Sequence, residues 1–306
     1  MKLWGPEAAL PPVSIARLHH SAGHTRQPGS SRPAGGAYGL RIRGVDLLPS
    51  DLVEAPVHWP SIELRVRVSQ AATPDPEYVD TATARLDVRA GGFVVMDRAA
   101  GRVTFTLRAS ATASALVHPH LAVVGAVWSH WLGRDAFHAG AFVAGDGVWG
   151  LLGDKGSGKS SALAALSRSG VPIVCDDVLV LEGATAFAGP RSIDLRAETA
   201  QVFGLGQHLG VVGNRERWRV PLGPIRPELP FRGWVALRWA EKPGIRSLRG
   251  ADRLGELLDH RALRVPPRAP AAMLDLAARP FLELSRPRDW DSTNYVLGLL
   301  LDAVSG

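Results

Sequence analysis

The feature that most constrains the fold is a glycine-rich segment in the middle of the chain, Gly153-Asp154-Lys155-Gly156-Ser157-Gly158-Lys159-Ser160. It matches the pattern G-x-x-x-x-G-K-[ST], the loop that binds the phosphates of a nucleoside triphosphate. The apolar run 147–152 before it is typical of a buried strand, and the run 162–166 after it is typical of a buried helix face. This strand-loop-helix setting predicts an α/β domain with a ligand site at the carboxyl ends of strands.

Each part of the loop has a predicted task. Backbone N–H groups turned inward by the glycines would surround phosphate oxygens, and Ser161 completes the predicted phosphate-binding set. Lys159 can reach the β- and γ-phosphates, and the Ser160 hydroxyl is the expected Mg²⁺ ligand. The whole chain has only four lysines, Lys2, Lys155, Lys159 and Lys242, and two of them lie in this loop. Because lysine is so scarce elsewhere, the match indicates a loop that binds a nucleoside triphosphate.

Length and composition limit the class of protein. The chain has 306 residues, of which 46% are apolar and 21% charged, enough for one large or two ordinary globular domains. The formal net charge of +6 comes mostly from arginines spread along the chain, which favours phosphate or acidic-peptide contacts over a nucleic-acid partner. A lone Cys175 excludes an internal disulfide, and charged residues interrupt the most apolar stretch, 121–152. We expect a cytoplasmic protein with no membrane contact. The sequence leaves open whether the protein forms a homo-oligomer.

The sequence divides into three parts. Residues 1–39 contain a stretch rich in Gly, Ser, Pro and Arg and predict a flexible leader, and residues 40–118 predict a β-rich N-terminal lobe. In that lobe, 61–68 alternates as a strand does, and 91–97 with 102–107 predict a hairpin. Residues 119–306 would form the catalytic domain, entered by a helix from Pro119 to about Gly133 and a strand over 136–143.

A pair of carboxylates is the second informative feature. Asp176-Asp177 directly follows the apolar strand 171–175. An aspartate at such a strand end supports Mg²⁺ in phosphate-loop enzymes, and a second could take the proton from an attacking hydroxyl. We favour Asp176 as the base and Asp177 as the metal partner, the alternative being that one of them caps the following turn. His138, in the strand expected beside the loop strand, is either catalytic or structural.

Three arginines further along the chain form another candidate. Arg215, Arg217 and Arg219 alternate with other residues, so on a strand they would share one face. Together they could neutralise the transferring phosphoryl group or hold an acidic substrate. The alternative is a solvated strand face.

The order and separation of three features resemble the catalytic domain of HPr kinase/phosphorylase. These features are His138, the loop 153–160 and Asp176-Asp177. The segments 189–196 and 280–289 are similar to stretches in HPr-kinase-like kinases of ribosomal peptide biosynthesis, including those that tailor lasso peptides. The resemblance covers about residues 136–300. It implies a fold related to phosphoenolpyruvate carboxykinase, ATP and Mg²⁺ as cofactors, an acid/base aspartate in the pair, and His138 nearby.

The chain also departs from that family. Lys155 replaces the usual serine of the loop, Ala139 separates the histidine from Gly140, and the family's glycine-rich signature is not recognisable in 189–203. These departures leave reverse phosphorylase activity and the acceptor open.

The functional hypothesis is a kinase that transfers the γ-phosphoryl group of ATP to a Ser or Thr hydroxyl of a peptide or small protein, with a ribosomal precursor peptide as one such acceptor. The alternatives are a non-catalytic ATP-binding accessory module of a biosynthetic complex and a small-molecule kinase. GTPase and transport-ATPase functions are less well supported, because the chain has neither an Asn-Lys-x-Asp nor a Leu-Ser-Gly-Gly motif.

Overall fold

The computed structural model describes residues 34–44, 51–69, 75–88, 92–107, 116–212, 215–267 and 269–305. All of them belong to one compact unit, Pro33–Gly306. Most of the predicted leader 1–39 therefore lies outside the described residues. Its end does not: Gly35–Ala37 forms strand β1, so the first sheet begins before residue 40.

The β-rich part is a single sheet with the described strand order β3-β1-β2-β4-β8-β7-β6-β5. Alternating side chains explain the sheet, because every second residue, such as Leu64, Val103 and Phe105, points into the core. The expected hairpin is confirmed as β7 paired with β8. Its strands are β1, β2 (Leu40–Arg43), β3 (Val53–Glu54), β4 (Ser61–Val68), β5 (Tyr78–Val79), β6 (Thr83–Asp87), β7 (Gly92–Asp97) and β8 (Arg102–Leu107).

The helix expected after Pro119 is confirmed as α2 (Leu121–Trp131), preceded by the short π-helical segment η2 (Leu116–His120). Most residues of α2 are buried, on more than one face of the helix, as expected for a helix that is apolar nearly all round. The indole N–H of Trp131 donates to the Asp80 carbonyl at 2.7 Å, which fastens α2 to the β5–β6 turn.

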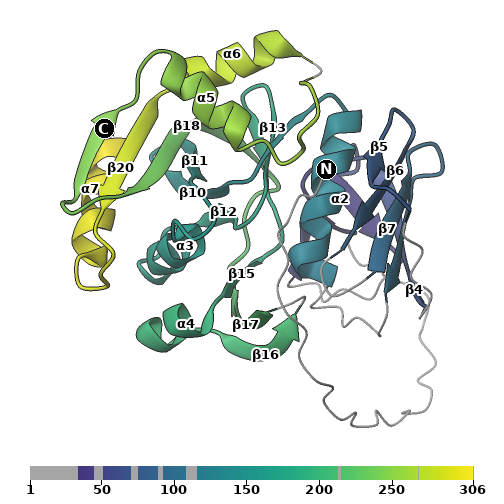
Figure 1. Ribbon diagram of the computed structural model, residues 1–306, viewed down its shortest axis with the longest axis horizontal. Helices are drawn as coiled ribbons and strands as arrows, with labels where there is room; N and C mark the ends of the chain where they lie inside the picture. Colours follow the sequence, from purple (N-terminus) through teal and green to yellow (C-terminus); the bar gives the residue numbers. More distant parts are fainter. Residues whose placement is uncertain are drawn as a thin grey trace. The chain divides into compact units, whose positions relative to one another are not determined.

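The central sheet has the described order β12-β10-β11-β18-β14-β13-β9, with β19 beside β20. Strand β20 lies beside β18 (Figure 1). It is mixed, with β11 and β18 parallel, β18 and β20 parallel, and β10 antiparallel to both β11 and β12. Its strands are β9 (Asp135–Phe137), β10 (Gly140–Ala144), β11 (Gly147–Leu152), β12 (Ile173–Cys175), β13 (Leu179–Glu182), β14 (Thr185–Phe187), β18 (Glu228–Trp239), β19 (Gly244–Ser247) and β20 (Phe281–Arg286).

The single strand expected over 136–143 is wrong, because it is two strands. β9 pairs with β13, whereas β10 pairs with β11 and β12, so the chain changes its place in the sheet at His138-Ala139. The His138 N–H leaves the ladder and donates to the His260 carbonyl at 2.6 Å. Alternation along the sequence carries no signal for such a change of partner.

A third, smaller sheet and the remaining helices complete the described fold. The sheet has the order β15-β17-β16, with α4 following β15 (Figure 1). No helix in the described ranges is long and apolar enough to cross a membrane. These elements are β15 (Ser192–Leu195), β16 (Gln207–Val212), β17 (Arg215–Pro221), α3 (Lys159–Arg168), α4 (Ala197–Phe203), α5 (Ala251–Asp259), α6 (Pro270–Ala278) and α7 (Thr293–Ser305).

Candidate active site

Four strand ends define the site. β11 and β12 both run antiparallel to β10, so they point the same way, and β18 and β20 run parallel to β11. Their carboxyl ends therefore meet at one edge of the sheet, where ligands of α/β proteins commonly bind. The glycine-rich loop follows β11, Asp176-Asp177 follows β12, and β18 and β20 end on Trp239 and Arg286.

The loop between β11 and α3 has the conformation that its glycines allow. Gly153, Gly156 and Gly158 have φ angles of +153°, +88° and +83°, which side-chain-bearing residues rarely adopt. A methyl group on Gly153 would come within 2.5 Å of the Ser157 Oγ atom, and one on Gly158 would collide with the Arg286 guanidinium. The loop is therefore tightly closed, and α3 begins directly behind it at Lys159.

Lys159 lies folded over this loop. Its ammonium group donates to the Gly153 carbonyl at 2.5 Å and to the Asp154 carbonyl at 3.4 Å. Burial lowers the pKa of Lys159, while the carboxylates of Asp177, Asp176 and Asp154 act in the opposite direction. A buried cation held by carbonyls and facing carboxylates suits the binding of phosphate oxygens.

Unsatisfied polar atoms in the site fit such a ligand. Within the described part of the chain, Ser157 Oγ and Asp176 Oδ1 are buried and have no hydrogen-bond partner. Leaving a buried polar atom unpaired costs about 1–3 kcal/mol, so native proteins rarely tolerate it without a reason. A phosphate next to the loop and a cation next to Asp176 would satisfy these two atoms. Ser161, by contrast, is already engaged, with its hydroxyl 2.9 Å from that of Thr199 on α4.

The two aspartates have different surroundings. Asp176 is buried, its Oδ2 accepts from the Asp194 N–H at 3.3 Å, and the Ser160 hydroxyl also hydrogen-bonds to it. Burial, and then the charge of Asp177, raises the pKa of Asp176 to about 6, against the opposing effects of His118 and Ser160. The Asp177 side chain is 29% exposed, and its Oδ2 lies 3.3 Å from His118 Nε2. The pair thus has one buried carboxylate next to Ser160 and one accessible carboxylate next to a histidine.

His118 is a site residue that the sequence analysis missed. It lies in η2, where its extended backbone (φ −143°, ψ 129°) interrupts the helical turn and directs the buried ring to Asp177. No motif spacing could have found it, because the contact depends on how the segment before α2 packs against the central sheet. His138, the histidine expected here, lies at the break between β9 and β10.

The three arginines of β17 do not form one group. Arg219 is buried and donates two hydrogen bonds to the Asp194 carboxylate, at 2.7 and 2.8 Å. Arg215 and Arg217, on the same face of the strand, are half-buried. Arg219 therefore supports the Asp194 backbone that contacts Asp176, and only the other two stay candidates for an external anion.

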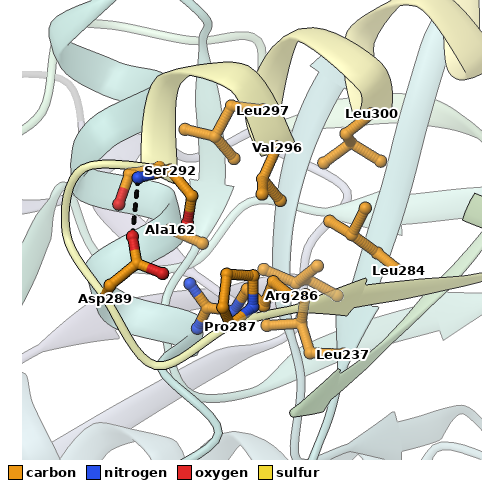
Figure 2. Close-up of a pocket in the computed structure, with 12 residues that line it drawn as sticks. Ala162, Leu237, Leu284, Arg286, Pro287, Asp289, Ser292, Val296, Leu297 and Leu300 are labelled. Atoms are coloured by element: carbon orange, nitrogen blue, oxygen red, sulfur yellow. Dashed lines mark hydrogen bonds between the residues drawn. The ribbon is translucent and has the colours of Figure 1, made fainter. Parts of the chain in front are cut away.

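Arg286 is the second site residue that the sequence analysis missed. Its guanidinium donates to the Ser157 carbonyl at 2.5 Å and lies 4.3 Å above the Trp239 ring centroid. Burial lowers the pKa of Arg286 to about 10. Figure 2 shows Arg286 and Pro287 at one end of an otherwise mostly apolar pocket whose walls come largely from β20 and α7. Arg286 thus fixes the loop from the side of the neighbouring strands.

Comparisons with known proteins give a distant structural likeness but no match in sequence. The sequence matches no protein-family model and none of the curated proteins. Among solved structures, the fold is similar to that of the Hpr(Ser) kinase/phosphatase from Coxiella burnetii. That similarity has a TM-score of 0.29 and 13% sequence identity, and it covers 55% of this chain and 95% of that chain. We therefore infer function from the residues of this site.

Proposed function

We propose that this chain is an ATP-dependent kinase that transfers a phosphoryl group to a Ser or Thr hydroxyl. The observation that carries the proposal is the meeting, at one sheet edge, of the closed glycine loop with its buried Lys159 and the unequal pair Asp176-Asp177. Binding of a nucleotide alone would need only the loop. A carboxylate that is accessible beside it supplies the proton acceptor that phosphoryl transfer to an alcohol requires.

The loop would hold the phosphates of ATP. In this motif the backbone N–H groups and the lysine bind phosphate oxygens, so the loop and Lys159 would do so here, and α3 would add the positive end of its dipole. ATP supplies the phosphoryl group, and Mg²⁺ offsets the charge of its phosphates. Ser160 and Asp176 are the residues placed to hold the metal, because the hydroxyl already hydrogen-bonds to the carboxylate.

This geometry favours the reverse of the assignment drawn from the sequence. Asp176 is buried against Ser160 and Asp194, so an incoming alcohol reaches it poorly. Asp177 is partly exposed, and His118 orients its carboxylate. We therefore assign the proton-accepting role to Asp177 and the metal-supporting role to Asp176.

The acceptor is proposed as a peptide or small protein, of which a ribosomal precursor peptide is the class suggested by the sequence resemblance. The test is incubation with γ-labelled ATP and serine-containing peptides, with the phosphorylated product identified by mass spectrometry. We expect phosphopeptide from the wild-type protein and from the surface control Asp302→Asn, and none from Lys159→Ala. ATP binding without any phosphorylated peptide would favour the accessory-module hypothesis, and a phosphorylated small molecule would favour a metabolite kinase.

A further inference from the structure

The small sheet β15-β17-β16 is directly connected to the proposed site. The Asp194 N–H on β15 donates to the Asp176 carboxylate at 3.3 Å. Asp194 is paired in register with Arg219 on β17, and the two side chains form a buried, doubly hydrogen-bonded ion pair. The face of this sheet that carries the Asp194 and Arg219 side chains is therefore connected to Asp176 through the Asp194 backbone.

Positive charge continues along that face, away from Asp176. Arg217 and Arg215 lie two and four residues before Arg219, so their side chains are on the same side of β17. Leu195 pairs with Trp218, so the next residue, Arg196, comes opposite Arg217. Burial lowers the pKa of Arg196, and the positive charges of Arg215 and Arg217 lower it further.

These charges are not neutralised within the described residues. None of Arg196, Arg215 and Arg217 has a carboxylate oxygen within ion-pair distance there, and the Arg217 Nε atom is buried without a hydrogen-bond partner. Glu198 is the one described carboxylate that opposes the pKa shift of Arg196, and its effect is smaller than that of either arginine. Like charges held together without a counter-charge are unfavourable, so the group suits an external anion.

We propose that Arg196, Arg215 and Arg217 bind acidic side chains of an extended peptide acceptor and so place its hydroxyl at the aspartate pair. Alternate residues of a strand lie about 6.6 Å apart, which is also the spacing of every second side chain in an extended peptide. A serine followed by aspartate or glutamate at alternate positions would match this row of arginines. The proposal rests on the proposed kinase function for the reaction, but the binding of the acidic peptide does not depend on it.

The test uses two fluorescent peptides, one with a serine followed by aspartates at alternate positions and its twin with asparagines. Binding is measured by anisotropy with the full chain, and phosphorylation is measured separately with ATP. We expect the aspartate peptide to bind at least about tenfold more tightly than its twin, as one lost charged hydrogen-bond pair would cause. The preference should weaken as salt rises.

Variants then locate the binding. Arg217→Gln and Arg196→Gln should each weaken binding of the aspartate peptide about tenfold and leave the affinity for ATP unchanged. Arg67→Gln, which changes an exposed arginine on β4, is the control and should behave as wild type. Equal affinity for both peptides, or equal effects of the three variants, would overturn the proposal.

The same data separate this proposal from the kinase proposal. Selective binding of the aspartate peptide without phosphorylation would support the arginine row and refute the kinase. Phosphorylation of both peptides at equal rates would do the reverse. The acidic-peptide assignment would be refuted, in favour of a small phosphorylated acceptor, if inorganic phosphate bound to these arginines and the aspartate peptide did not compete with it.

Discussion

At the scale of single residues, the surroundings of Asp176 change its acidity strongly. Its pKa rises from 3.8 to about 6, chiefly because burial disfavours the ionised form. The folded state therefore binds this proton more tightly than the unfolded state does. Below about pH 4, Asp176 is protonated in both states, and its burial does not lower the free energy of unfolding. As the pH rises through about 6, the buried carboxyl must ionise, and this part of the free energy of unfolding is lost.

We expect Asp176→Asn to be more stable than wild type at pH 8, by about 3 kcal/mol, because asparagine has no charge to bury. The advantage should shrink to about zero at pH 4. Urea unfolding at a series of pH values measures it, with Asp302→Asn on the surface of α7 as control. An advantage that does not change with pH would show that the Asp176 carboxylate is not desolvated.

His118 gives a second prediction at this scale. Without the ring, the Asp177 carboxylate loses the group that orients it. His118→Ala should lower kcat about tenfold while the affinity for ATP stays unchanged, in line with the loss of other outer-shell partners. His118→Gln, which keeps a hydrogen-bond donor, should recover part of kcat. A change confined to ATP affinity would place His118 outside the proton-transfer step.

The site residues that the sequence predicted differ from those that it missed in how far along the chain their partners lie. The loop, Lys159 and Asp176-Asp177 could be predicted because each lies within a local motif at a strand end. His118 and Arg286 could not, because they reach the site from segments distant in the sequence. Arg219 looked like a free cation, since nothing in the sequence shows that Asp194 faces it from the neighbouring strand.

At the scale of elements, the glycine loop and the end of β20 form one packed unit. Gly156 and Gly158 both have positive φ angles, but only a side chain at Gly158 would meet Arg286. The backbone strain of an alanine is therefore similar at the two positions, about 1–2 kcal/mol, and any difference reports the packing of the loop against β20.

We expect Gly158→Ala to be about 1–2 kcal/mol less stable than Gly156→Ala, because the methyl group displaces the guanidinium. Adding Arg286→Ala to each variant should remove most of that difference. Denaturant unfolding without nucleotide measures it. Equal stability of the two single variants would show that Arg286 is not packed against the loop.

Local patterns predicted the elements well where a strand keeps one partner. β4, the β7–β8 hairpin, α2 and α3 lie close to their expected bounds. The break at His138-Ala139 was missed. Before the break β9 pairs with β13, whereas after it β10 pairs with other strands, and the packing of the whole sheet decides this change of partner. The strand order of the central sheet could likewise be predicted only in part, since β18 and β20 come from far along the chain.

At the scale of the whole chain, the N-terminal sheet and the central sheet share contacts and one buried apolar cluster. The Tyr38 N–H donates to the Ala188 carbonyl at 2.8 Å, and the Trp59 indole donates to Glu228 at 2.6 Å. Leu40 and Trp59 belong to the same core as Phe187 and Phe231. The predicted boundary at residue 119 would cut through this core and would also remove His118.

We therefore expect a fragment of residues 119–306 to lack a cooperative unfolding transition, because its apolar face would be left in water. A fragment of residues 33–306 should keep the stability of the full chain, since it contains the whole compact unit. Circular dichroism during heating distinguishes them. A cooperative transition in the shorter fragment would show that the central sheet folds alone.

The central claim is that a loop-bound nucleotide, a buried metal-supporting Asp176 and an accessible base Asp177 act together. The most direct test is the Mg²⁺ dependence of phosphoryl transfer to a peptide by Asp176→Asn and Asp177→Asn. Asp176→Asn should need more Mg²⁺ for half-maximal rate, whereas Asp177→Asn should keep the wild-type Mg²⁺ requirement and lose about 10²–10⁴-fold in kcat. Wild-type rates in both variants would contradict the account.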